Sequence, residues 1–252
     1  MLNDTIAGAQ PRGPRARFSR RATSTTTRVH PSAASPLAER SDVLPTLSAV
    51  ELGCRRGNRV LFQGLNLELR ARQATWLRGR NGRGKTSLLR LIAGLSVPES
   101  GQVLWNGTSV RRSPSFQREL VYIGHANALK DDLSATEALQ FLARMHDRAC
   151  DVGALHAALD RLDMAHRRDA MVRTLSQGQR RRVALARLAL ERRAALWVLD
   201  EPFDALDADG IARVNGLLGE HLARGGSALL TSHQHPGAAA PPMAEFDLDT
   251  LD

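Results

Sequence analysis

The 252-residue sequence contains few cysteines and no long apolar run. Cys54 and Cys150 are its two cysteines, and neither belongs to a C-x-x-C pair or to a zinc-ligand spacing. A disulfide framework is therefore excluded, and a reducing compartment is the default. No stretch approaches the roughly eighteen apolar residues of a membrane-spanning helix. The sequence also shows no internal repeat, which excludes a solenoid or a tandem array.

Lysine is also scarce: it occurs only at positions 85 and 130, although the chain carries 35 lysine and arginine residues together. The formal net charge is +9 and the pI is about 11. Such a balance suits a nucleic acid or an anionic membrane surface as a partner. The arginines are spread along the chain, however, and a composition rich in arginine and alanine is also typical of codon bias. The charge is therefore weak evidence for either partner.

The first 46 residues differ in composition from the rest of the chain. They are rich in Arg, Ser, Thr and Pro and contain three acids, Asp4, Glu39 and Asp42. This composition predicts a disordered basic extension over 1–46. A start codon placed too early and an organelle transit peptide are the alternatives, whereas the missing apolar segment excludes a secretory signal.

From residue 47 the hydrophobic pattern alternates between short strands and helices. Strands are predicted at 47–52, 60–69, 76–77, 101–107, 121–123, 194–199 and 228–231, and helices after residue 86 and at 135–166, 175–193 and 211–222. Strands that alternate with helices indicate an α/β fold with a mostly parallel sheet. The Asn-Gly pair at the end of 101–107 predicts a tight turn. The Ala/Pro-rich segment 236–252 is predicted to be a loose tail.

The segment 79–86 fits G-x-x-x-x-G-K-[ST], the phosphate-binding loop of nucleotide hydrolases. A strand precedes it and a helix follows it, which is the context that the motif requires. Glycines let backbone N–H groups point inward around anionic oxygens, and the helix directs its positive N-terminus to the same place. The predicted nucleotide-binding residues here are Gly79, Arg80, Asn81, Gly82, Arg83, Gly84, Lys85, Thr86 and Ser87. Lys85 is expected to reach the β- and γ-phosphates and the Thr86 hydroxyl to bind Mg²⁺.

Two adjacent acids, Asp200 and Glu201, follow the apolar run 196–199. Parallel α/β sheets bind their ligands at the carboxyl ends of strands. Asp200 is therefore predicted to hold the Mg²⁺ shell and Glu201 to act as the general base that polarises the attacking water.

Three further elements come after the phosphate loop in the sequence. Residues 175–179, Leu-Ser-Gln-Gly-Gln, open a helix whose Ser and Gly offer a hydroxyl and free N–H groups to a phosphate. Asp207 ends the loop that follows the acid pair. His233 ends the last apolar strand, where an imidazole can donate a hydrogen bond to a phosphate. Taken singly, the 175–179 segment is better explained as an ordinary helix cap, and His233 as a structural surface histidine.

In this order the elements resemble the nucleotide-binding domain of ATP-binding cassette (ABC) proteins, over about residues 47–235. The resemblance implies a P-loop NTPase fold with a mostly parallel core sheet, a small antiparallel β subdomain and an α-helical subdomain at about 126–180. It also implies that two cassettes pack head to tail, as a homodimer, with ATP between the phosphate loop of one and the 175–179 segment of the other. Ser176, Gly178 and Gln179 would then contact ATP held by the other chain's phosphate loop. Asp207 would lie across the interface, and Lys85, Glu201 and His233 would serve catalysis.

The sequence departs from the family pattern at three positions. Gln177 stands where glycine is usual, at a tolerant position. His125 takes the place of a glutamine that touches Mg²⁺ and reports to the membrane partner; a neutral imidazole can contact a metal-bound water, but it titrates near neutral pH. Arg56 stands where a tyrosine often stacks on adenine, and an arginine can stack on a base as well.

Short local matches favour one branch of this family. Gly124-His125 and the segments 53–57, 101–105, 181–187 and 195–200 resemble the haem-exporter ATPase of bacterial cytochrome c maturation. That resemblance implies ATP and Mg²⁺ as ligands and an integral membrane transporter subunit as partner. It also implies a periplasmic haem chaperone as an indirect partner, and a peripheral position on the cytoplasmic face of the bacterial inner membrane. Nothing in the residues shows that haem contacts this chain.

Three alternatives remain open from the sequence. A cassette for another cargo, such as a lipid, a drug or a metal, would carry the same motifs. A non-transport ABC ATPase acting on nucleic acid would suit the basic charge, but the chain has neither a long coiled-coil insertion between Lys85 and Ser176 nor a second cassette, so no nucleic acid partner is predicted. A regulatory binder without hydrolysis is opposed by the presence of both Glu201 and His233.

Overall fold

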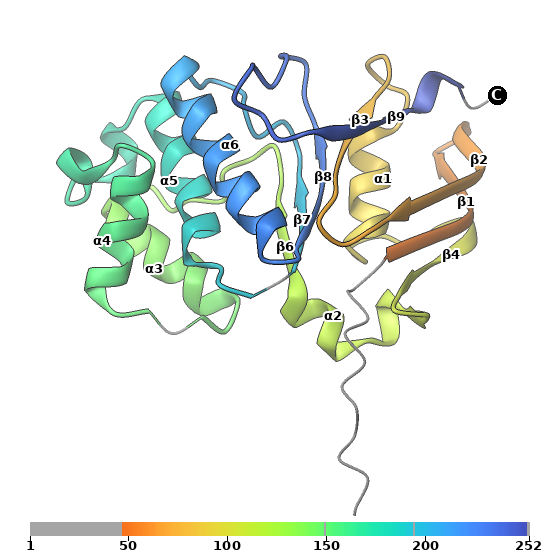
Figure 1. Cartoon of the computed structure of the whole chain (residues 1–252), viewed down its shortest axis with the longest axis horizontal. Coiled ribbons are helices and arrows are strands. Elements are labelled where there is room, and N and C mark those ends of the chain that lie inside the picture. The colour runs from red at the N-terminus through yellow and green to blue at the C-terminus, as the bar shows by residue number, and fades with distance from the viewer. Residues whose placement is uncertain (1–46, 149, 194, 251–252) are drawn as a thin grey trace, which may run out of the picture. The chain divides into compact units, whose positions relative to one another are not determined.

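The computed structural model describes residues 47–148, 150–193 and 195–250. The predicted basic extension at 1–46 lies outside the described residues. The chain forms an antiparallel sheet, a parallel sheet and a group of helices (Figure 1). Among the described residues, no helix is both long and apolar enough to cross a bilayer.

The antiparallel sheet has the strand order β2-β1-β4-β5. Its strands are β1 (Leu47–Arg56), β2 (Arg59–Leu69), β4 (Ser100–Trp105) and β5 (Thr108–Ser109). Between β4 and β5, Asn106 and Gly107 have φ angles of 50° and 77°. Two successive positive φ angles are what a two-residue hairpin turn requires, so the predicted Asn-Gly turn is confirmed.

The parallel sheet has the order β6-β7-β8-β3-β9, and each neighbouring pair is parallel. Its strands are β3 (Ala74–Arg78), β6 (Leu120–Ile123), β7 (Leu196–Leu199), β8 (Ser227–Thr231) and β9 (Met243–Asp247). Because all five strands point the same way, their carboxyl ends lie along one edge of the sheet. The phosphate loop, His125, Asp200 and His233 follow β3, β6, β7 and β8, so the topology gathers them at that edge.

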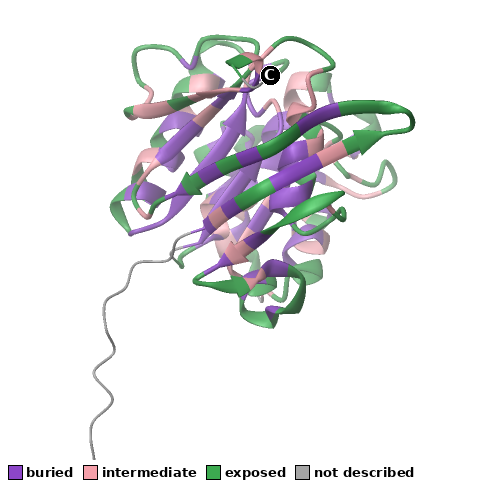
Figure 2. Ribbon diagram, turned by 90° about the vertical axis from the view of Figure 1, so that its right-hand side faces the viewer, coloured by how far each residue is buried: buried purple, intermediate pink, exposed green. Residues whose placement is uncertain are grey.

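The central strands are buried on both faces, as expected of a parallel sheet. Val198 and Leu229 belong to a core shared with the antiparallel sheet, whereas the adjacent Trp197 and Leu230 belong to a core shared with the helices. Figure 2 shows these strands as buried, and the exposed residues on the outer strands and loops. Alternate residues of one strand therefore support two different subdomains.

Six α-helices pack around the two sheets in the described part of the chain (Figure 1). They are α1 (Lys85–Ile92), α2 (Pro114–Glu119), α3 (Ala135–Met145), α4 (Val152–Arg161), α5 (Gln177–Leu190) and α6 (Ala208–Ala223). Four of the eight residues of α1, Leu88, Leu89, Leu91 and Ile92, are buried in the core that contains both sheets. Packing on two sheets thus fixes the helix whose N-terminus receives the phosphate loop.

Two predicted helices are shorter in the structure. The predicted helix at 135–166 is broken after Met145, and a new helix begins at Val152 because the Asp151 side chain accepts the Ala154 N–H. The predicted helix at 175–193 spans Gln177–Leu190 instead. Ser176 caps its start, with its hydroxyl accepting the Gln179 N–H while the Gln179 side chain accepts the Ser176 N–H.

The prediction of a loose tail at 236–252 was wrong for residues 243–250. Met243–Asp247 form β9, which pairs along the whole of β3, and a short 3₁₀ turn, η4 (Leu248–Thr250), follows it. Residues 243–250 are ordered by the backbone hydrogen bonds between β9 and β3 and by the burial of Leu248. The Ala/Pro-rich composition of the preceding residues does not predict these contacts.

Candidate active site

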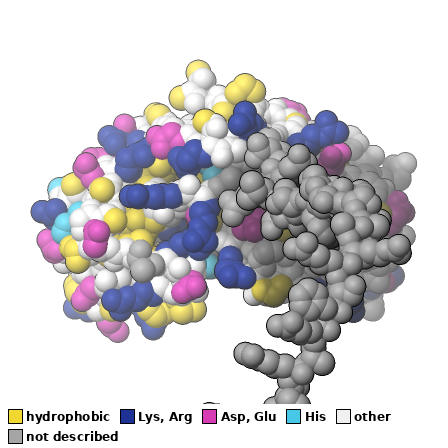
Figure 3. All heavy atoms as spheres, turned by 60° about the horizontal axis from the view of Figure 1, so that its bottom comes forward, with side chains coloured by type: hydrophobic (Ala, Val, Ile, Leu, Met, Phe, Trp, Pro, Cys, Tyr) yellow, Lys and Arg dark blue, Asp and Glu magenta, His cyan; other side chains and the backbone are white. Residues whose placement is uncertain are grey.

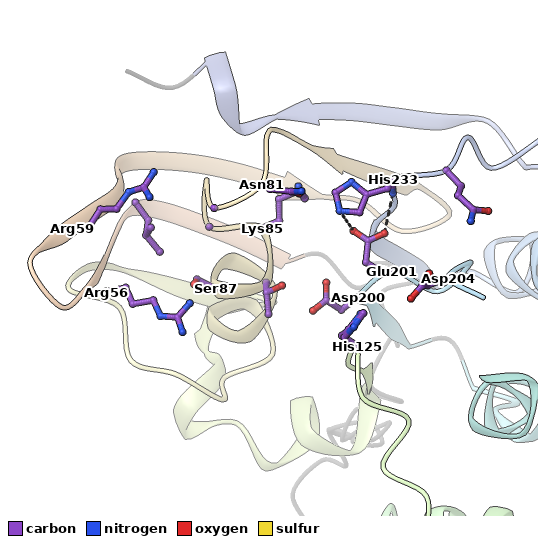
Figure 4. Close-up of a pocket in the computed structure, with 15 residues that line it drawn as sticks. Arg56, Arg59, Asn81, Lys85, Ser87, His125, Asp200, Glu201, Asp204 and His233 are labelled. Carbon is purple, nitrogen blue, oxygen red and sulfur yellow. Dashed lines mark hydrogen bonds and ion pairs between the residues drawn. The ribbon is translucent and has the colours of Figure 1, made fainter. Parts of the chain in front are cut away.

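A cavity of about 500 Å³ opens at the carboxyl edge of the parallel sheet. Its lining combines the phosphate loop and the start of α1 with residues of β1 and β2 and of the segments that follow β6, β7 and β8 (Figure 4): Arg56, Arg59, Leu61, Asn81, Gly82, Gly84, Lys85, Thr86, Ser87, His125, Asp200, Glu201, Asp204, His233 and Gln234. Most of the predicted site residues thus meet in one place, although they are spread over about 180 positions of the sequence.

The phosphate loop is held in a shape that depends on glycine. Gly79, Gly82 and Gly84 have φ angles of 133°, 79° and 103°, which side chains strongly disfavour. A Cβ at Gly84 would lie 3.1 Å from the Leu61 Cβ and 3.2 Å from the Phe62 ring. Gly84 is also the N-cap of α1 and supplies no side-chain cap. The first N–H groups of the helix therefore remain available to an anionic oxygen.

Lys85 lies in the lining of the cavity, and its Nζ donates a 2.6 Å hydrogen bond to the Gly79 carbonyl. Nζ also lies 3.4 Å from the Arg80 carbonyl. The ammonium thus spans the phosphate loop, and a phosphate oxygen can replace either carbonyl as its partner.

Asp200 is held by a hydrogen bond to one of its oxygens. It is 2 % exposed, and its Oδ1 accepts a 2.9 Å hydrogen bond from the Thr231 hydroxyl. Its Oδ2 is buried and has no hydrogen-bond partner in the part of the chain that is described. A buried carboxylate oxygen without a donor fits a magnesium-bound water, and the Thr86 hydroxyl lines the same cavity. The described residues include no cluster of three or more acids, histidines and cysteines that could hold a metal without the phosphates.

Glu201 occupies a strained backbone position beside Asp200. Its φ angle is 51°, which is uncommon for a residue other than glycine, and its N–H donates a 2.8 Å hydrogen bond to the Thr231 hydroxyl. Its carboxylate contacts His233 twice: Oε2 accepts the His233 N–H at 2.9 Å, and Oε1 lies 3.4 Å from the ring Nε2 (Figure 4). The hydrogen bond of its N–H fixes the unusual Glu201 backbone, and the two contacts with His233 orient the carboxylate in the cavity. A general base requires such a fixed position.

Arg181, on α5, connects the acid pair to the loop that contains His125. It is 3 % exposed and donates to the carbonyls of Gly124, Asp200 and Glu201 and to the Asn127 side chain, at 2.7 to 3.1 Å. Sequence analysis did not identify this role, because neither the burial nor the partners of one arginine in a run of three can be read from its neighbours.

His125 lines the cavity, and Figure 4 shows it next to Asp200. Its predicted contact with a metal-bound water stays a prediction. Arg56 also lines the cavity, as its predicted place beside the base requires, and Arg59 lies with it. These two arginines are paired directly across the β1–β2 hairpin. The hairpin spacing is the signal that could have identified Arg59.

The 175–179 segment and Asp207 lie elsewhere, in a second cavity of about 370 Å³. It is lined by Ser176, Gly178, Gln179 and Asp207 together with Asp163, Met164, His166, Arg182 and Ala205. One chain therefore does not bring these residues to Lys85. This is the arrangement that a site shared between two chains requires.

Local contacts also explain two of these residues. A Cβ at Gly178 would lie 2.6 Å from the Ala205 carbonyl oxygen, so the close approach of α5 to the 203–207 loop requires glycine. The Asp207 side chain caps α6 through the Gly210 N–H and pairs with Arg182. These two partners, the Gly210 N–H first, lower the pKa of Asp207.

Three of the phosphate-loop residues predicted to bind the nucleotide lie outside the lining of the main cavity. Gly79 packs against Leu248, the Arg80 N–H donates to the Asp249 carboxylate, and the Arg83 guanidinium donates to the Leu248 carbonyl. Their side of the phosphate loop faces the chain's C-terminal segment.

Comparison with known proteins agrees with this geometry. Residues 62–204 match the family model described as ABC transporter. The chain is 44% identical over 206 residues to the cytochrome c biogenesis ATP-binding export protein CcmA of Albidiferax ferrireducens, covering 81% of this chain and 98% of that protein. It is 47% identical over 199 residues to the protein of the same name from Aromatoleum aromaticum, covering 79% and 93%. The chain belongs to the ABC transporter family, with the CcmA proteins among its relatives.

Two solved structures support the fold of this ABC protein. A putative ABC transporter ATP-binding protein from Pyrococcus furiosus superposes with a TM-score of 0.70 at 21% identity, covering 82% of this chain and 98% of that one. An ATP-binding subunit of an ABC transporter superposes with a TM-score of 0.66 at 24% identity, covering 74% and 79%. The predicted fold class, an ABC nucleotide-binding domain, is confirmed, and the family identifies the chain as an ATP-hydrolysing subunit.

Proposed function

We propose that this ATPase powers the haem export or delivery step of cytochrome c maturation, as the peripheral subunit of a membrane transporter. The observation that carries this proposal is the identity of 44% to 47% over nearly the whole length of relatives named as cytochrome c biogenesis export proteins. The rival cargoes, a lipid, a drug or a metal, have no comparable observation in their favour. The scattered charge does not favour a nucleic acid either: in Figure 3 basic side chains are interspersed with acids over the described part of that face.

The residues of the main cavity have separate roles in hydrolysis. Lys85 and the N–H groups at the start of α1 bind the phosphates of ATP. Thr86 and Asp200 hold Mg²⁺, which supplies charge neutralisation at the phosphates when it is bound. Glu201 takes the proton of the attacking water. His233 holds the Glu201 carboxylate through its backbone N–H and offers its ring to the terminal phosphate.

The working unit is a homodimer in this proposal. The Lys85 cavity and the Ser176 cavity are separate in one chain, so one complete site needs the phosphate loop of one copy and the 175–179 segment of another. Closure of two copies on ATP and reopening after hydrolysis would drive an integral membrane subunit, which we place on the surface around His125 and α3. A periplasmic haem chaperone would receive the haem from that subunit, while this chain stays at the cytoplasmic face of the inner membrane.

The test replaces the sole copy of this ATPase in its bacterium with the Lys85→Ala variant and stains c-type cytochromes for covalent haem. We expect mature cytochromes c to be lost, while membrane proteins with non-covalent haem keep their spectra and the variant accumulates at the wild-type level. Normal cytochromes c at that level would reject the haem proposal and leave an ABC ATPase for another cargo.

A further inference from the structure

The C-terminal segment lies against the outer side of the phosphate loop. β9 pairs with β3 in parallel register, with Leu77 opposite Phe246 and Arg78 opposite Asp247. β3 enters the phosphate loop at Gly79, immediately after this ladder. The residues that follow β9 therefore emerge beside the residues that begin the loop, although about 170 positions separate them in the sequence.

Asp249 makes the main contacts with the phosphate loop. Its Oδ2 accepts a 2.8 Å hydrogen bond from the Arg80 N–H. Its Oδ1 lies 3.2 Å from the Arg83 Nε, and its Oδ2 lies 3.4 Å from the Arg80 Nε. Next to it, the Leu248 carbonyl accepts a 2.9 Å hydrogen bond from the Arg83 guanidinium. One carboxylate thus bridges a backbone N–H and two guanidinium groups of the same loop.

Asp249 is itself fixed in place. Leu248 is 1 % exposed in the core between the two sheets, and a Cβ at Gly79 would lie 3.2 Å from the Leu248 Cβ. The Asp249 N–H donates a 2.9 Å hydrogen bond to the Asp247 side chain, and the Thr250 hydroxyl donates to the Asp247 carbonyl at 2.7 Å. The buried Leu248 and the hydrogen-bonded turn at Asp247–Thr250 therefore keep the Asp249 carboxylate beside the phosphate loop.

These contacts determine which cation of the loop faces the cavity. Arg80 and Arg83 bond to the C-terminal segment, whereas Lys85 lines the cavity. Burial raises the pKa of Asp249, but the Arg80 N–H and the charges of Arg80 and Arg83 outweigh it, so the pKa is lowered. The carboxylate is ionised at neutral pH and can hold both guanidinium groups away from the phosphates.

We propose that Asp249 is a positioning residue for nucleotide binding: it holds the phosphate loop in its anion-binding shape from the outside and keeps Arg80 and Arg83 out of the cavity. It does not contact the nucleotide. The proposal rests on nucleotide binding at the Lys85 loop, and it is independent of the cargo of the transporter.

The test compares ATP affinity in the full chain for wild type, Asp249→Ala, Asp249→Asn and Glu245→Ala, with a fluorescent ATP analogue and Mg²⁺. Glu245 is a matched control, because it is an acid of the same segment that pairs with Arg78 at 2.7 Å, before the loop begins. Melting without nucleotide and hydrogen exchange at residues 79–84 are measured on the same samples.

We expect Asp249→Ala to weaken binding about tenfold and to speed exchange in the loop. Asp249→Asn should recover part of the affinity, since its amide oxygen can still accept the Arg80 N–H, and Glu245→Ala should bind like wild type. The proposal is overturned if Asp249→Ala binds ATP as well as or better than wild type, or if Glu245→Ala loses as much affinity. If Asp249→Ala does not fold, Asp249→Asn decides alone, with unchanged binding as the contrary result. A wild-type chain that binds no ATP would instead contradict the proposed function.

Discussion

The His233 N–H donates a 2.9 Å hydrogen bond to the Glu201 carboxylate, and this bond joins the ends of two neighbouring parallel strands. Two further bonds have the same effect: the Glu201 N–H donates to the Thr231 hydroxyl, and that hydroxyl donates to the Asp200 carboxylate. Both acids are therefore oriented by β8, although both belong to the end of β7. The proposed general base, Glu201, is therefore oriented by a strand other than the one that it follows.

Glu201→Gln is expected to abolish turnover without abolishing ATP binding. The amide still accepts the His233 N–H, but it cannot take a proton from water, so hydrolysis should fall by about 10²- to 10⁴-fold. Phosphate release and bound nucleotide should be measured together, with Glu220→Gln as control, because Glu220 is an exposed partner of Arg161. Unchanged turnover in Glu201→Gln would refute the assignment of the base.

Lys85→Ala should strongly weaken nucleotide binding, whereas Lys130→Ala should not. Lys85 lines the cavity, while Lys130 lies 4.2 Å from the Phe141 ring in the helical part. Loss of a charged hydrogen-bond partner of phosphate should weaken ATP binding by about a hundredfold. Calorimetric titration of both variants checks this, and similar affinities in the two would show that the loop cation is not decisive.

Arg181→Met should lower both stability and turnover. The carbonyls of Gly124, Asp200 and Glu201 would lose their donor, at a cost of about 3 kcal/mol in the free energy of unfolding. The loop with His125 would also lose its connection to the acid pair.

Arg180→Met is the matched control for that variant. Arg180 is the preceding residue on the same helix. Its guanidinium donates to the Leu175 and Arg173 carbonyls and pairs with Asp131, so it has no contact with Asp200 or Glu201. Urea unfolding and ATPase assays on both variants test the difference. If the two variants lose turnover equally, Arg181 has no special connection to the acids.

His221 should make stability fall as pH decreases. It is fully buried, stacks on Trp197 at 3.9 Å between ring centroids, and its Nε2 donates to the Ser227 carbonyl. Burial is the main cause that lowers its pKa to about 4. Because the unfolded chain takes up the proton near pH 6.5, stability is complete above that pH and declines between about 6.5 and 4, by about 2 kcal/mol at pH 5.

His221→Phe is the variant that tests this slope. It keeps a stacked ring without a titrating nitrogen, so its unfolding free energy should change less between pH 7.5 and pH 5 than that of wild type. Urea unfolding at the two pH values gives the comparison. Equal pH dependence in both proteins would assign the slope to other groups.

Local patterns predicted the chemistry of this chain. The glycine and lysine spacing of 79–86 and the acids after 196–199 are patterns of a few consecutive residues, so they can be recognised in the sequence. Parallel strands also bring their carboxyl ends to one edge of the sheet, independently of the loops that connect them. For that reason the sequence alone predicts Lys85, Thr86, Asp200, Glu201 and His233 at one edge of the sheet, and the structure places them in one cavity.

The tertiary structure alone decided what holds these groups in position. Asp249 meets Arg80 because β9 pairs with β3, and nothing in a short strand after an Ala/Pro-rich stretch reveals its partner. Arg181 reaches three carbonyls only because α5 packs against β6 and β7. The sequence determined which reactive groups are present and on which strand ends. Packing and strand register between distant segments determined their orientation, because contacts between distant segments leave no periodic trace in the chain.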